Sequence, residues 1–253
     1  MKIYVIASNT FREALKDRLI FSLLITGVML ILCSLLVAEL AFVQRVKVIT
    51  DVGLAAITLT GIIMAVFSAS NLFAREIERK RIYSILSKPV ARWQLVIGKY
   101  IGAVFSLTLN LVLMTIFLLI LLYIDSQVWE TAIFKAALLI EMELLVVAAL
   151  AIFFSSFTSS LLSLFYSFLI FVAGNMIEDI RAYWQIKSII GRAVAKAVYY
   201  IVPNLETFNI KQEVVHHLPV PFTVIGGAML YGALYIIILI AAAVWMFQFR
   251  DLE

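Results

Sequence analysis

Six long apolar segments constrain this 253-residue chain more than any other feature of its sequence. A membrane-spanning helix needs about 20 consecutive apolar residues. We predict spans at about 19–38, 52–73, 101–124, 136–157, 161–177 and 224–247. Hydrophobic residues make up 64% of the chain and charged residues 14%, whereas soluble domains contain roughly 45–50% and 25%. The sequence therefore predicts an all-α polytopic membrane protein with one transmembrane domain over 1–253, and it excludes a water-soluble enzyme.

Basic residues predict how the chain is oriented in the membrane. Short loops rich in Lys and Arg stay on the cytoplasmic side. Four basic residues lie within 1–18 and seven within 74–100, whereas the short loops on the other side contain Arg45, Lys47 and Lys135. We therefore expect both termini and 74–100 to be cytoplasmic, and 178–222 to be extracytoplasmic. The net charge of +4 fits this asymmetry, and we expect no nucleic-acid partner.

Two segments outside the spans have the pattern of amphipathic helices. Residues 1–18 place apolar and charged side chains on opposite sides at helical spacing. We predict an interfacial elbow helix, which either anchors the chain in the bilayer or also contacts a cytoplasmic partner. A second amphipathic helix is predicted at about 179–201, between spans five and six, and Pro203 ends it. We expect it to lie near the outer interface.

The loop at 74–100 combines dense charge with an apolar face. Ile82, Ile85 and Leu86 have the i, i+3, i+4 spacing of one side of a helix, and Pro89 marks a turn after it. One interpretation is a lipid-contacting basic loop. Apolar residues in this order favour the other interpretation, in which the short helix docks into a groove on a partner protein.

Two acidic residues, Glu141 and Glu143, fall within the fourth predicted span. Ionisable groups at membrane depth face a cavity or a polar partner. Residues two apart on a helix point to roughly opposite faces, so the pair cannot form one catalytic site. We predict that they belong to a transport pathway or to a polar network, with Asn110 and Asn175 as possible partners.

No pattern in the sequence predicts a catalytic or metal site. The chain contains no G-x-x-x-x-G-K-[ST] phosphate loop, no H-E-x-x-H and no recognisable Ser-His-Asp set. His216 and His217 are adjacent on a loop, a poor arrangement for binding one ion together, and Cys33 is the only cysteine. We expect no catalytic residues, no metal and no bound cofactor, so energy for any active process must come from another chain.

Several local patterns resemble the membrane subunit of type-2 ABC exporters, and in particular the permeases associated with multicopper-enzyme maturation. These are an opening YVIASNTFREALKDR, the stretch REIERKRIYSILSKPVARWQLVIGKYIG, the turn FFSSFTSS at 153–160, the outer segment YYIVPNLETFNI at 199–210 and the closing FQFRDLE. They are spread over nearly the whole chain. The stretch at 75–102 is the most specific.

The resemblance implies a permease in the cytoplasmic membrane of a prokaryote, present in two copies and paired with two ATP-binding subunits that hold ATP and Mg²⁺. The coupling helix would contain Ile82, Ile85 and Leu86, with Pro89 and Arg92 at the same docking site. An extracytoplasmic protein could act as a further partner through 178–222. A stand-alone secondary transporter or channel that uses Glu141 and Glu143 is the alternative. The sequence does not identify a substrate.

Overall fold

The computed structural model describes residues 2–39, 44–78, 91–127, 130–177, 199, 202–216 and 218–249. Within these residues it contains eight α-helices and one short 3-10 turn. They are α1 (Lys2–Leu15), α2 (Arg18–Glu39), α3 (Arg45–Glu78), α5 (Arg92–Ser126), α6 (Ala132–Ser155), α7 (Ser160–Asn175), η2 (Glu206–Phe208), α10 (Lys211–Val215) and α11 (Phe222–Gln248).

Five of these helices are long and apolar enough to cross a membrane, namely α2, α3, α5, α6 and α11. They coincide with five of the six predicted spans, so the all-α, multi-span prediction is confirmed for them. The fifth predicted span corresponds to α7, which has 16 residues. At 1.5 Å per residue this helix is about 24 Å long, shorter than the ~30 Å hydrocarbon core of a bilayer.

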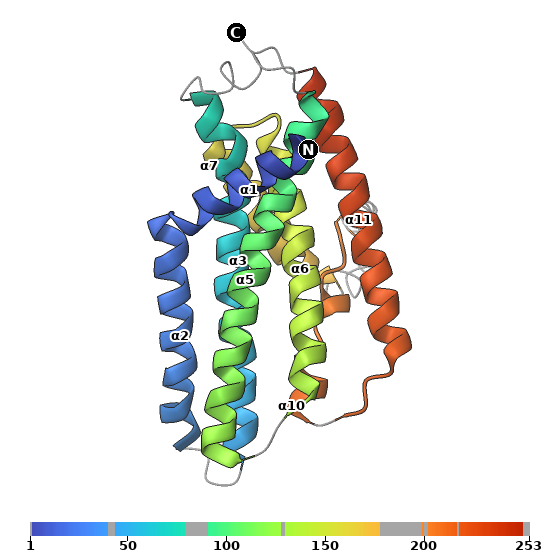
Figure 1. The fold of residues 1–253 in the computed structure, drawn as a ribbon. Helices are drawn as coiled ribbons and strands as arrows, with labels where there is room; N and C mark the ends of the chain where they lie inside the picture. The colour runs from blue at the N-terminus through green and yellow to red at the C-terminus, as the bar shows by residue number, and fades with distance from the viewer. Residues whose placement is uncertain are drawn as a thin grey trace, which may run out of the picture.

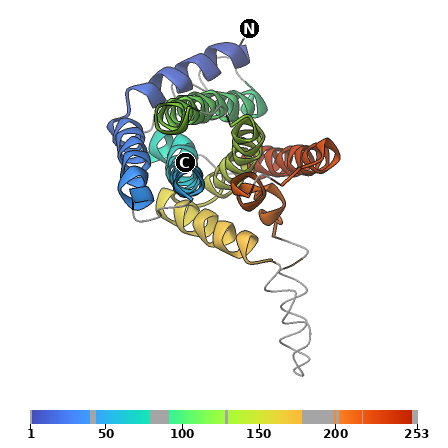
Figure 2. The ribbon, with the colours of Figure 1, turned by 90° about the horizontal axis from the view of Figure 1, so that it is seen from below.

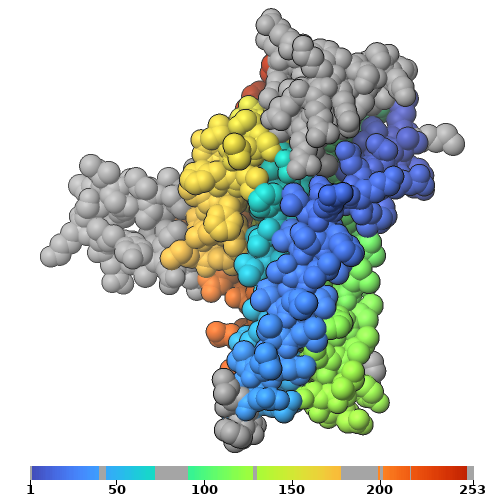
Figure 3. Space-filling view, turned by 90° about the vertical axis from the view of Figure 1, so that its left-hand side faces the viewer, coloured from blue at the N-terminus to red at the C-terminus, as the bar shows by residue number. Residues whose placement is uncertain are grey.

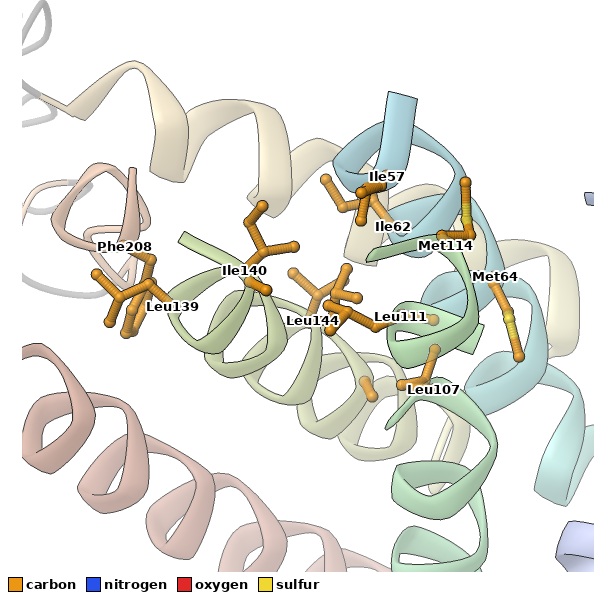
Figure 4. Close-up of a cluster of buried hydrophobic side chains, with 14 of the residues drawn as sticks. Ile57, Ile62, Met64, Leu107, Leu111, Met114, Leu139, Ile140, Leu144 and Phe208 are labelled. Carbon is orange, nitrogen blue, oxygen red and sulfur yellow. The ribbon is translucent and has the colours of Figure 1, made fainter. Parts of the chain in front are cut away.

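The helices form an elongated bundle with α3 near its centre (Figures 1 and 2). Helices α2, α5, α6 and α7 all pack against α3, and α11 packs mainly on α6. The apolar core between them includes Ile57, Met64, Leu107 and Leu144 (Figure 4). Viewed from the side of α2 and α7, part of α3 is visible between those two helices (Figure 3).

The starts of α1 and α5 and the ends of α3 and α11 lie at one end of the bundle (Figure 1). We call this the α5-start end. The predicted elbow helix is present as α1, which runs across α5 rather than along it (Figure 1). That this end faces the cytoplasm stays a prediction. The amphipathic helix predicted at 179–201 falls almost entirely outside the described residues.

A group of serines joins three helices near the α5-start end. Ser163 on α7 donates to the carbonyl oxygen of Ala151 on α6, at 2.9 Å, and lies 3.2 Å from the hydroxyl of Ser70 on α3. Ser155 donates to the carbonyl oxygen of Ser70, at 3.0 Å, and Ser160 donates to Asn71 Oδ1, at 2.7 Å. Such bonds satisfy buried polar atoms where no water is at hand. They fix the α6–α7 turn, where the sequence predicted a turn rich in Phe and Ser.

The segment 202–216 belongs to the loop that the sequence predicts to be extracytoplasmic. It packs into the bundle, and the apolar residues Leu205, Phe208, Ile210, Val214 and Val215 are all buried. The backbone N–H of Leu205 donates to the carbonyl oxygen of Gly174, at 3.2 Å, and that of Asn204 donates to the hydroxyl of Tyr231, at 2.8 Å. Although the segment also contains polar residues, its apolar residues form part of the core of the bundle.

Candidate functional site

Arg92, the first residue of α5, ties that helix to the end of α11. Its guanidinium Nη1 donates to the carbonyl oxygens of Phe247, at 3.0 Å, and Gln248, at 2.8 Å. It also lies 6.0 Å from the centre of the Phe247 ring, at the limit of a cation–π contact. The last carbonyls of a helix lack partners within that helix, and a cation favours this negative end of the helix dipole. Arg92 is therefore well suited to cap α11.

The same turns of α5 hold α1 through two glycines. A Cβ atom added at Gly98 would lie 2.8 Å from Ile6 Cγ2, and one at Gly102 would lie 2.7 Å from the carbonyl oxygen of Ala7 and 2.6 Å from Thr10 Cβ. The small-xxx-small pair is thus a packing site, as its spacing indicates, and its partner is α1. Helix α5 is therefore joined to both α1 and α11 within its first three turns.

We expect Gly102→Val to loosen α1 from α5. The added side chain would collide with the α1 backbone, which cannot move as a flexible side chain can, and overpacking of this kind costs about 1–3 kcal/mol. Gly227→Val in α11 is a matched control, because a Cβ atom at Gly227 would meet nothing within 4 Å. Thermal unfolding in detergent should show a lower Tm for the Gly102 variant than for the control. Equal Tm values would contradict the packing role.

Gly226 and Gly227, at the start of the sixth predicted span, have open space around them. Small residues at the start of a span are typical of close helix packing, but neither glycine has a neighbour within 4 Å of an added Cβ atom. The start of α11 stands away from the described part of the bundle at this point. By contrast, a Cβ atom added at Gly232 would lie 3.1 Å from Phe208 Cζ, in the segment 202–216.

The predicted docking residues Ile82, Ile85, Leu86 and Pro89 lie outside the described residues, and of that set only Arg92 is described. The structure does define what their segment connects. Helix α3 ends at Glu78 and α5 begins at Arg92. Residues 79–91 therefore link the central helix of the bundle to the helix that holds α1 and α11.

Glu143 on α6 is the buried member of a polar cluster near the segment 202–216. Its side chain is 2% exposed and accepts a long hydrogen bond, of 3.5 Å, from Asn175 Nδ2 on α7. Lys211 on α10 attracts Glu143 and Asp51 electrostatically. Burial lowers the pKa of Lys211, and the attraction of the two carboxylates opposes that shift. We call these four residues the Glu143 cluster.

Glu141 has different surroundings, as the helical geometry predicts. Its Oε1 lies 2.6 Å from Thr108 Oγ1 on α5, and its Oε2 is buried without a hydrogen-bond partner among the described residues. It lines a groove of about 390 Å³ between α5, α6 and α11. The structure therefore does not bring the two carboxylates together. Of the two asparagines proposed as partners, Asn175 meets Glu143, whereas Asn110 donates to Met64 Sδ, at 2.9 Å.

Sequence reasoning missed two charged partners. Lys211 belongs to 178–222, which the sequence predicts only as an extracytoplasmic loop. The apolar neighbours of Lys211, namely Phe208, Ile210 and Val214, are the signal that this segment is buried. Asp125 at the end of α5 forms an ion pair of 2.9 Å with Arg45 at the start of α3. This pair joins the two helices at the end of the bundle opposite Arg92.

The described residues contain no group of three or more His, Cys, Asp or Glu side chains placed to hold a metal ion. Comparison with known protein families finds no family model that matches the chain. Comparison with curated proteins finds no match either. The five long apolar helices define the class of this protein as a multi-pass, all-α membrane protein.

Proposed function

We propose that this chain is the membrane subunit of an ATP-binding-cassette transporter, most similar to exporters. ATP hydrolysis on a separate subunit would drive movement of a substrate or a change in an extracytoplasmic partner. This chain would provide the path through the membrane and no catalytic residue. The proposal starts from the resemblance of 75–102 to a coupling region. The observation that supports it best is the set of contacts at the start of α5.

A coupling loop must transmit a movement of its partner at the membrane surface to the membrane-spanning helices. Residues 79–91 lead directly into Arg92, which caps α11, and into the glycines that hold α1. Helix α5 then continues without a break for 35 residues, about 52 Å at 1.5 Å per residue. Its far end is paired with α3 through Asp125 and Arg45. A shift of 79–91 would therefore act on α1, α11 and α3 through one rigid helix.

A second copy of the chain is part of the proposal. Helix α7 exposes large apolar side chains, namely Leu161, Phe165, Phe168 and Leu169. In a bilayer such a face can meet lipid or another protein. The shortness of α7 favours a protein neighbour, because a helix shorter than the hydrocarbon core is accommodated partly by oligomerisation. We place the interface between two permeases on this face.

The alternative is a stand-alone secondary transporter or channel. The observation that favours it is the presence of two acidic residues within a spanning helix, the buried Glu143 and the partly buried Glu141 of α6. In that case transport would follow an ion or proton gradient and would need no nucleotide. The two functions therefore differ in their source of energy.

Purification from native membranes distinguishes them. We expect the chain to purify in mild detergent with a subunit that contains a phosphate loop, in equal amounts, and with ATP hydrolysis in the complex. The chain alone should show none. Purification as a single component whose transport in vesicles responds to an ion gradient, and not to ATP, would contradict the proposal and support the alternative.

A further inference from the structure

The hydroxyl group of Thr108 has two oxygen neighbours but only one hydrogen to donate. Its Oγ1 lies 3.0 Å from the carbonyl oxygen of Val104 and 2.6 Å from Glu141 Oε1. Both distances fall within the range of O–H···O bonds or close to it. If the two contacts are separate hydrogen bonds, the hydrogen of one of them is supplied by the other partner. A backbone carbonyl has none to give.

Other threonines in the spanning helices show which acceptor the hydroxyl hydrogen of such a residue binds. Thr50, Thr58 and Thr60 each donate to the carbonyl oxygen four residues earlier, at 2.7 to 2.9 Å. Thr108 has the same relation to Val104. If its hydrogen is used there, as in the other three, Oγ1 is the acceptor toward Glu141. The hydrogen of the 2.6 Å contact then belongs to Glu141.

The second oxygen of Glu141 leads to the same conclusion independently. Oε2 is buried and has no hydrogen-bond partner among the described residues. An ionised carboxylate shares its charge over both oxygens and needs donors at both. A buried charge without partners costs far more free energy than a neutral carbonyl in the same place. The observed pattern, one bonded and one unbonded oxygen, is that of a carboxylic acid.

Among the described residues, no other charged side chain lines the groove around Glu141. On α5, Tyr100 interacts with Glu141 electrostatically, and its hydroxyl donates to the carbonyl oxygen of Leu145, at 3.3 Å. On α6, Glu143 faces Asn175 instead. The α11 residue of the groove is Met229, and the rest of the described lining is aliphatic apart from Thr108 and Met142.

We propose that Glu141 is a proton-binding site within the membrane, held as a neutral carboxylic acid whose Oε1–H group donates to Thr108. The ligand is a proton rather than a metal cation, because a hard cation requires several oxygen ligands and the groove provides a single unbonded one. An ammonium group is excluded for a related reason, since Oε2 is covered. The proposal does not depend on an ATP-binding partner.

Infrared difference spectroscopy of the purified full-length chain tests this directly. Subtracting the spectrum of Glu141→Gln from that of the wild type at neutral pH should leave one carboxylic-acid C=O band, which shifts in D₂O because its proton exchanges. Glu143→Gln, two residues away on the same helix, is the matched control and should leave the Glu141 acid band in place. Glutamine has the shape of the neutral acid, so the Glu141 variant should fold normally.

Thr108→Val provides a second measurement on the same site. It leaves Glu141 in place but removes its hydrogen-bond acceptor, so the acid C=O band should remain and change frequency. Loss of carboxylate bands in the Glu141→Gln difference spectrum would overturn the proposal. An acid band that is indifferent to Thr108→Val would overturn the assignment of Thr108 as its partner.

Discussion

Replacing Ile85 and Leu86 together with aspartate is expected to separate this chain from its ATP-binding partner. Burying side chains of this size stabilises a contact by roughly 1.5–3 kcal/mol each relative to exposure. The replacement also places two carboxylates in an apolar groove, which is costly unless they are paired. The variant should insert and fold, because no span is altered. It should lose the partner on purification, or keep it with ATP hydrolysis uncoupled from transport.

Changing Arg79 and Lys80 to glutamine is the control for this prediction. Solvated charges contribute little to a contact, typically about 0–1 kcal/mol. We therefore expect the glutamine variant to retain its partner and its coupled activity. If the aspartate variant is fully coupled while the glutamine variant is impaired, 79–90 is a lipid-contacting loop and the docking role is wrong.

The second large effect is expected at Glu143. Substitution by glutamine removes the buried carboxylate that attracts Lys211. No ion pair joins these two side chains among the described residues, so the cost should lie below the ~3–5 kcal/mol of a buried pair in contact. Thermal unfolding in detergent should show a marked fall in Tm. Glu141→Gln should change Tm little, because glutamine reproduces the hydrogen bond of the neutral acid to Thr108. Two substitutions of the same chemistry, two residues apart, thus have opposite expected outcomes.

A double variant separates charge from shape at this cluster. Lys211→Met combined with Glu143→Gln removes both charges, and replacing a buried pair by residues of similar volume is often nearly neutral. We expect the double variant to recover most of the Tm lost in Glu143→Gln. If Glu143→Gln is as stable as the wild type, or if Lys211→Met gives no recovery, the two residues are not coupled.

The sequence predicts those parts of the fold that depend only on the length of a local apolar segment. The five long spans, the α1 helix and the packing role of Gly98 and Gly102 all follow from patterns within about 20 residues, because a spanning helix satisfies its own backbone. The separation of Glu141 from Glu143 follows from helical geometry in the same way. Predicting these features does not require knowing which helices are neighbours in the fold.

The features that were not predictable depend on contacts between distant segments. Arg92 and Phe247 are 155 residues apart in the sequence, and no local pattern around either residue indicates that they are in contact. The burial of 202–216 was not predicted because Glu206, Lys211 and Glu213 give the segment a polar average hydropathy. The packing expected at Gly226 failed because small residues permit a close approach without requiring a neighbour.

The central claim is that 79–90 docks on an ATP-binding subunit and acts through the start of α5. A photo-reactive amino acid at position 85, in cells that express the whole complex, tests this most directly, with Tyr123 near the opposite end of α5 as the control position. The account predicts a cross-link from position 85 to the subunit that contains the phosphate loop, and none from position 123. Cross-links from position 85 to lipid alone, in a preparation that still transports, would contradict it.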